Sequence, residues 1–291
     1  MAERQQREHG RHHRGIFWVQ LARARRSGMA RWALLAMLVA VALSFAQTCL
    51  AFWGHDVAEL PSAAVGWAGN STAVGAVSWS MLVFFLLFLL PCAAFSDALL
   101  TDVRCRAAGC IATRTATVRY VLATVAVAAL VGFVVVLVPL VVSQLLAFLV
   151  FPVATTEGFA GSFNASAAEV ALSTSDEMRL FPDLWESLPY LYNLLFICYD
   201  ALWGAIVSAA SVAVSLYVHN SRLLVVGAPT LVCLLSSFLL PSEWALYSYL
   251  APSDWVRGLS EAYFVAAPLI VAGVVAAMIG WALLGKRDVL L

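Results

Sequence analysis

Six long apolar runs, separated by short polar segments, dominate the hydrophobic pattern of this chain. A run of about 18 or more apolar residues is long enough to cross a membrane as a helix. The third run, "VLATVAVAALVGFVVVLVPLVV", lacks the alternation that is typical of the strands of a membrane β-barrel. We therefore predict an all-α membrane protein with six transmembrane helices, over residues 32–53, 73–95, 120–151, 188–218, 223–240 and 263–284.

The distribution of basic residues predicts the orientation of these helices. Only 12% of the residues are charged, and the formal net charge is zero. Cytoplasmic loops of membrane proteins are enriched in Lys and Arg. With the N-terminus inside, fifteen of the seventeen basic residues lie inside, and only Arg179 and Arg257 lie outside. We therefore predict that both termini are cytoplasmic and that segments 54–72, 152–187 and 241–262 are external.

A basic N-terminus, residues 1–31, precedes the transmembrane domain of residues 32–291. The segment "IFWVQLARARRS" (16–27) begins with aromatic and aliphatic residues and ends with arginines. This pattern favours a short helix on the inner surface of the membrane. The alternative is an ordinary basic flank without a helix.

The external segment before the last apolar run is rich in aromatic residues. Trp244, Tyr247, Tyr249 and Trp255 fall within residues 241–262. Tyr and Trp favour the headgroup level of a bilayer. We predict that this short amphipathic segment lies at the outer interface.

The sequence offers no catalytic or cofactor site. The segment "GWALLGKR" (280–287) has the Gly and Lys spacing of a phosphate-binding loop, but Arg follows where Ser or Thr is required. Cys105 and Cys110 form a single pair without a nearby His, which is a weak metal signal. The apolar runs contain no His and one plainly intramembrane carboxylate, Asp200, which argues against an intramembrane protease. We predict no enzymatic activity, no cofactor and no metal.

Polar and small side chains recur on one face of the fourth apolar run. Steps of seven, four and four residues place Asn193, Asp200, Gly204 and Ser208 on one helical stripe. Small residues let helices approach closely, whereas an ionisable residue inside a span is a functional candidate. The stripe is therefore either a helix-packing seam or a polar wall of a transport path. Gln144, in the third run, is a candidate partner for Asp200.

Charge gathers in the cytoplasmic loop between the second and third runs. The stretch "FSDALLTDVRCRAAGCIATRTATVRY" (95–120) holds two Asp and four Arg between two apolar runs. One interpretation is an ordinary positive-inside loop. The other is a surface on which a soluble partner docks.

Two stretches carry a family resemblance. "PCAAFSDALLTDVRCRAAGCIATRTATVRYVLAT" (91–124) contains a Pro, an Asp-bearing segment, a Gly, a Thr-Arg pair and an Arg-Tyr pair. "SLYVHNSRLLVVGAP" (215–229) lies at the turn between the fourth and fifth runs. Together with the order of elements, they resemble bacterial type-2 ABC exporter permeases. "RCRAAGC" departs from the acidic and Ser-Gly residues usual there, and no Lys follows the Tyr. The matching residues are Pro91, Asp97, Asp102, Gly109, Thr113, Arg114, Arg119, Tyr120, Ser215, Asn220 and Pro229.

The resemblance implies a permease subunit in the bacterial cell membrane that exports a substrate which the sequence does not identify. Loop 96–119 is then a coupling loop for a separate ABC ATPase subunit. A second permease chain, identical or related, completes the path, the lipid bilayer surrounds it, and no nucleic acid is involved. The alternative function is that of a non-transporting membrane protein, such as an immunity, sensor or assembly factor. The expected coupling residues are Asp97, Asp102, Arg104, Arg106, Arg114, Arg119 and Tyr120.

Overall fold

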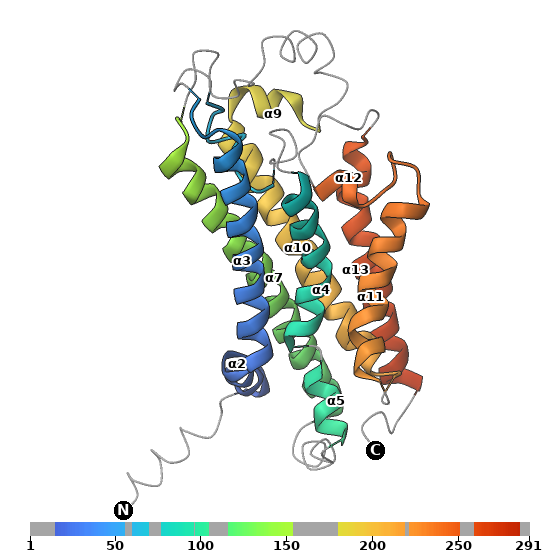
Figure 1. The fold of residues 1–291 in the computed structure, drawn as a ribbon. Helices are drawn as coiled ribbons and strands as arrows, with labels where there is room; N and C mark the ends of the chain where they lie inside the picture. The colour runs from blue at the N-terminus through green and yellow to red at the C-terminus, as the bar shows by residue number, and fades with distance from the viewer. Residues whose placement is uncertain are drawn as a thin grey trace, which may run out of the picture.

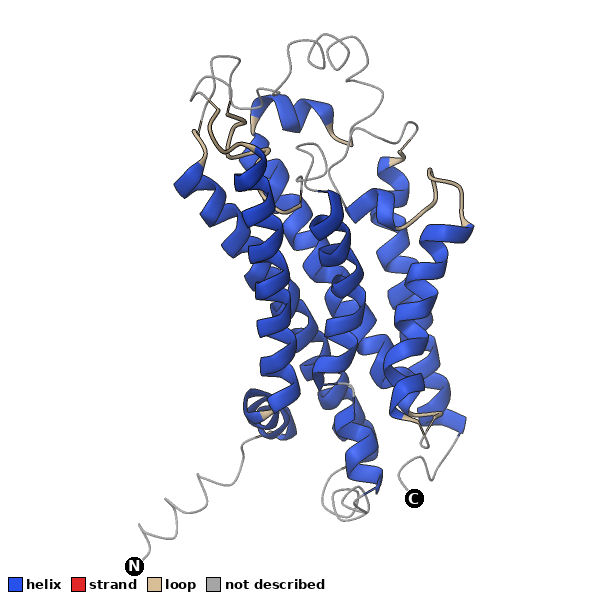
Figure 2. Ribbon diagram, viewed as in Figure 1, coloured by secondary structure: helices blue, strands red, loops and turns tan. Residues whose placement is uncertain are grey.

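The computed structural model of the protein describes residues 15–55, 60–69, 77–95, 97–104, 116–153, 180–218, 221–250 and 259–285. Within these ranges the chain forms helices and no strand (Figure 2), which confirms the predicted all-α fold for this part of the chain. The helices are α2 (Ile16–Arg26), α3 (Gly28–Ala51), α4 (Val77–Phe95), α5 (Asp97–Arg104), α7 (Thr117–Val150), α9 (Pro182–Ser187), α10 (Pro189–Ser215), α11 (Arg222–Leu239), α12 (Tyr247–Leu250) and α13 (Glu261–Gly285) (Figure 1).

Five of the described helices, α3, α7, α10, α11 and α13, are long and apolar enough to cross a membrane. α4 is apolar as well, but its stretch Leu82–Phe95 is shorter than the roughly 20 residues of a typical crossing. A chain with these helices is a multi-pass membrane protein.

Capping serines set where two of the helices begin. Ser27 has an extended backbone between α2 and α3, and its Oγ accepts a hydrogen bond from the Ala30 N–H at 3.4 Å. Ser221 caps α11 in the same way through the Leu224 N–H at 3.3 Å. The turn at Ser27 places α2 across one end of α3 (Figure 1). The helix predicted within residues 16–27 is present as α2.

α10 is the central helix of the bundle. It contacts α4, α7, α11 and α13. In the most apolar 18-residue stretch of α10, 72% is buried inside the protein, whereas the corresponding share is 22% for α11 and 28% for α13. The apolar surfaces that α11 and α13 expose are expected to face lipid or another protein.

Tyrosine hydroxyls tie together the segment before α13 that is predicted to be external. The Tyr249 hydroxyl donates to the Glu243 carbonyl oxygen at 2.7 Å and accepts from the Ser260 N–H at 3.1 Å. The Tyr263 hydroxyl donates to the Trp244 carbonyl oxygen at 3.0 Å. The short helix α12 is thereby held at the end of the bundle opposite α2 (Figure 1). Residue 255 lies outside the described residues.

Two glycines bring α7 and α10 into close contact. A Cβ added to Gly132 would lie 2.4 Å from the Gly204 carbonyl oxygen, and one added to Gly204 would lie 2.8 Å from the Gly132 carbonyl oxygen. One turn further along, the Ser208 hydroxyl donates to the Ala128 carbonyl oxygen at 2.8 Å. Small residues that let two backbones approach are typical of helix contacts in membranes. This contact fixes the antiparallel register of α7 and α10.

Replacing Gly204 by Ala should destabilise the protein by about 1–3 kcal/mol, because the new methyl group overpacks the contact with Gly132. The matched control is Gly273→Ala in α13, where no atom lies within 4 Å of the added Cβ. The control should be neutral or stabilising, since Ala favours helix by about 1 kcal/mol over Gly. Thermal unfolding of the detergent-solubilised protein measures both. Equal midpoints for the two variants would show that the contact is not tight.

Candidate functional site

The carboxylate of Asp102 joins three helices at the α2 end of the bundle. Asp102 lies in α5, and its residue surface is only 6% exposed. Its Oδ2 accepts a hydrogen bond from Arg23 Nη1 of α2 at 2.6 Å, which is also an ion pair. The Tyr120 hydroxyl of α7 donates to the same oxygen. We refer to these three residues as the Asp102 cluster.

Apolar side chains at the junction of α4 and α5 pack against α2 next to the Asp102 cluster. Phe95, Ala98 and Leu99 are buried in one apolar cluster with Ala24 of α2. Tyr120 is fully buried, so its bond to the carboxylate satisfies a polar group that is removed from water. The Arg23 side chain is 38% exposed, and solvent therefore weakens the ion pair itself.

The structure brings only some of the predicted loop residues together. Asp102 and Tyr120 meet in the Asp102 cluster. Arg119 lies one residue earlier in the first turn of α7 and is exposed. Asp97 and Arg104 are the first and last residues of α5. The structure therefore places Asp102 and Tyr120 in a contact within the bundle, and the coupling role of the loop residues stays a prediction.

The sequence does not single out Arg23, the partner of Asp102 that lies 79 residues away along the chain. An available signal was the series of arginines at the end of segment 16–27, opposite two acidic residues in loop 96–119. Nothing in their spacing indicates which arginine meets which acid. Arg106 and Arg114 lie outside the described residues.

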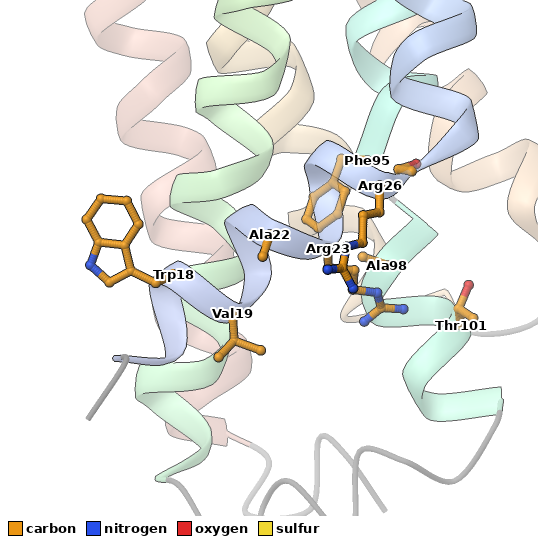
Figure 3. A pocket seen from close by; sticks show the side chains of 9 residues that line it. Trp18, Val19, Ala22, Arg23, Arg26, Phe95, Ala98 and Thr101 are labelled. Carbon is orange, nitrogen blue, oxygen red and sulfur yellow. The ribbon is translucent and has the colours of Figure 1, made fainter. Parts of the chain in front are cut away.

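A pocket of about 560 Å³ opens between α2 and α5, next to the Asp102 cluster (Figure 3). Arg23 and Arg26 line it from α2, and Phe95 and Ala98 line it from the opposite side. Figure 3 shows Trp18 at the far end of α2 from these arginines. The pocket therefore presents positive charge over an apolar wall.

Residues 60–69, between α3 and α4, form a non-helical segment inside the bundle, and its last nine residues are all buried. The Ala63 N–H donates to the Pro152 carbonyl oxygen at 2.9 Å, just beyond the end of α7. The Ala68 N–H donates to Ser143 Oγ at 2.8 Å. Ser143 lies two turns before the end of α7, so the segment descends about 10 Å along that helix. We refer to it as the re-entrant segment.

Two of the predicted polar residues hold the re-entrant segment. Asn193 Nδ2 donates to the Ala64 carbonyl oxygen at 2.9 Å and to Gln144 Oε1 at 2.9 Å. Gln144 Nε2 donates to the Ala63 carbonyl oxygen at 3.0 Å. Non-helical backbone is tolerated at membrane depth where it is buried in protein with its polar groups paired. Asn193 and Gln144 pair two of these carbonyl groups.

The candidate pairing of Gln144 with Asp200 is wrong, because Gln144 bonds to Asn193 and the re-entrant segment instead. Both carboxylate oxygens of Asp200 are buried without a hydrogen-bond partner among the described residues. Gly204 and Ser208 lie in the contact with α7. Burying an unpaired carboxylate is costly, which distinguishes Asp200 from the other residues of the stripe.

No group of three or more His, Cys, Asp or Glu in the described part of the chain could hold a metal ion. Comparison of the chain with known protein families, curated proteins and solved structures finds no match. The residues of the chain itself must therefore support any assignment of function.

Replacing Asp102 by Ala should loosen α2 and α5. The change leaves the buried Tyr120 hydroxyl without its acceptor, which costs about 1–3 kcal/mol. We expect a lower thermal midpoint and faster tryptic cleavage at the end of α2. Thr101→Ala is the matched control, because Thr101 is the exposed neighbour in α5. Wild-type unfolding and trypsin resistance in Asp102→Ala would contradict the role assigned to this carboxylate.

Replacing Asn193 by Leu should release the re-entrant segment. The Ala64 carbonyl group and the Gln144 amide then lose a partner, and such a loss costs roughly 1–3 kcal/mol of local stability. Ser62→Cys, at a buried position in a background without native cysteines, reports the release by its labelling with a membrane-impermeant maleimide. We expect labelling about tenfold faster. Leu194→Ala, on the exposed face of α10, is the control, and equal rates in both variants would count against the role of Asn193.

Proposed function

We propose that this chain is the transmembrane permease subunit of an ATP-binding-cassette exporter in the bacterial cytoplasmic membrane. It has six spans, with α4 as the second, and both termini are cytoplasmic. A separate ATPase subunit hydrolyses ATP, and a second permease chain completes the path of the substrate. The resemblance over residues 91–124 and 215–229, together with the uneven distribution of basic residues, supports this proposal.

The arrangement of the helices favours an even number of spans. The beginning of α3 and the end of α13 lie at the same end of the bundle (Figure 1). α4 measures 19 residues in all and contacts α3, α7 and α10. It therefore packs as a spanning helix would, although its Leu82–Phe95 stretch is short.

The main structural support for the proposal is the attachment of α5 to the bundle. α5 is a short helix directly after α4, where the resemblance expects a coupling helix. Asp102 bonds it to Arg23 of α2 and to Tyr120 of α7. A soluble subunit that moves α5 would therefore move α2 and α7 with it. α7 in turn contacts α10 at Gly132 and Gly204, so the displacement reaches the centre of the bundle.

The polar stripe of α10 has two roles in this proposal. Asn193, Gly204 and Ser208, with Gln144 of α7, serve packing between helices and the re-entrant segment. Asp200 is the residue of the stripe that suits a substrate path, because its carboxylate has no partner among the described residues.

Reversing the charges at Arg104, Arg106 and Arg114 together should release the ATPase subunit while the permease stays in the membrane. Charge complementarity across an interface contributes to recognition, and opposing like charges costs several kcal/mol. We expect at least tenfold weaker co-purification with a candidate ABC ATPase subunit, and loss of its ATPase stimulation. The matched control reverses Arg4, Arg7 and Arg11, which lie on the same predicted side but outside the loop.

Undiminished ATPase binding and stimulation in the loop variant would refute the coupling role. If no ATPase co-purifies even with the wild-type chain, the alternative of a non-transporting membrane protein gains support. Equal loss in the loop variant and the control would indicate a general effect of the basic surface.

A further inference from the structure

The pocket between α2 and α5 combines two arginines with an apolar wall (Figure 3). Arg23 and Arg26 lie one turn apart on α2, and Val19, Ala22 and Phe95 supply apolar surface. Its volume of about 560 Å³ falls within the roughly 300–1,000 Å³ of pockets that bind small molecules. A ligand that fits this pocket has an anionic group and an apolar part.

The two arginines differ in the hydrogen-bonding capacity that they can offer a ligand. Arg23 Nη1 is bound to Asp102 at 2.6 Å. The Arg26 guanidinium group forms no hydrogen bond or ion pair with the described residues. A guanidinium group binds phosphate oxygens through two parallel N–H groups. Arg26 is therefore the principal group available to an anion in this pocket.

The position of the pocket indicates what kind of anion reaches it. α2 directly precedes α3, so the pocket lies at the end of a membrane-spanning helix. Trp18, which also lines the pocket, is 60% exposed. Trp favours the headgroup level of a bilayer. Basic pockets at the cytoplasmic ends of spanning helices bind anionic lipid headgroups.

We propose that this pocket binds an anionic phospholipid of the inner leaflet. The lipid phosphate contacts Arg26, and the upper part of an acyl chain covers Val19, Ala22 and Phe95. The assignment to the inner leaflet uses the orientation proposed above, but lipid binding does not depend on an ATPase or on export. The bound lipid fills the space between α2 and α5 and holds these helices at their separation beside the Asp102 cluster.

Native mass spectrometry of the purified full-length protein tests the proposal. The protein is titrated with dioleoyl phosphatidylglycerol and, for comparison, with dioleoyl phosphatidylcholine. We expect phosphatidylglycerol to bind more tightly. Arg26→Gln should weaken its binding about tenfold, because the lipid phosphate loses a charge-assisted hydrogen bond. Arg25→Gln removes the same charge from an exposed side chain outside the pocket, and it should change the affinity by less than about twofold because solvent and salt screen that charge.

A second variant tests the pocket without changing any charge. Ala22→Trp fills the space beside Arg26 and should weaken phosphatidylglycerol binding at least as much as Arg26→Gln. Unchanged binding in Ala22→Trp would overturn the proposal. Equal weakening by Arg25→Gln and Arg26→Gln would also overturn it, because it would indicate diffuse attraction to a basic surface.

Three further outcomes would assign the pocket differently. Equal binding of the two lipids would rule out selection of an anionic headgroup. Displacement of the lipid by an equimolar amount of inorganic phosphate would identify a site for the free anion. Loss of a co-purifying ATPase from Arg26→Gln, with lipid binding unchanged, would identify a protein-docking surface.

Discussion

The contact between α7 and α10 at Gly132 and Gly204 is the constraint on which the rest of the structure depends. Neither glycine has room for a side chain, so the two backbones meet directly. In a membrane the hydrophobic effect does not drive helices together, and close packing of small residues takes its place. The contact sets the antiparallel register of the two helices. That register brings Gln144 opposite Asn193 toward one end and Ser208 opposite Ala128 toward the other.

Each end of this helix pair holds a different element. At the end away from α2, Gln144 and Asn193 bond to the backbone of the re-entrant segment. At the α2 end, Tyr120 of α7 meets Asp102 of α5 and, through it, Arg23 of α2. Apart from the half-exposed Arg23, both attachments use buried, hydrogen-bonded polar side chains, and buried polar groups in proteins generally have such partners. One rigid pair of helices thus connects a non-helical segment at one end to a short amphipathic helix at the other.

This connection gives the proposed functions a common physical basis. A force on α5 acts on α7 through the Asp102 carboxylate and the apolar packing beside it, and it reaches α10 both through α7 and through direct contact with α5. The pocket beside that carboxylate lies between the same two short helices, so its occupant would affect how freely α5 moves relative to α2. Asp200 differs from its neighbours on α10 because the register that pairs Asn193 with Gln144 leaves its carboxylate unpaired among the described residues.

The sequence by itself determined the helical class, the positions of most of the apolar helices and the helix after residue 16. Run length, helical periodicity and charge clustering are local properties, and they are visible in a single chain. Only the tertiary structure decided that Asp102 meets Arg23, that Gln144 pairs with Asn193 rather than Asp200, and that residues 60–69 enter the bundle. These partners lie far apart along the chain, and no local pattern encodes which helices pack together. The Gly132–Gly204 contact sets the register that brings Gln144 to Asn193, whereas the packing of α2 and α5 against α7 brings Arg23 to Asp102.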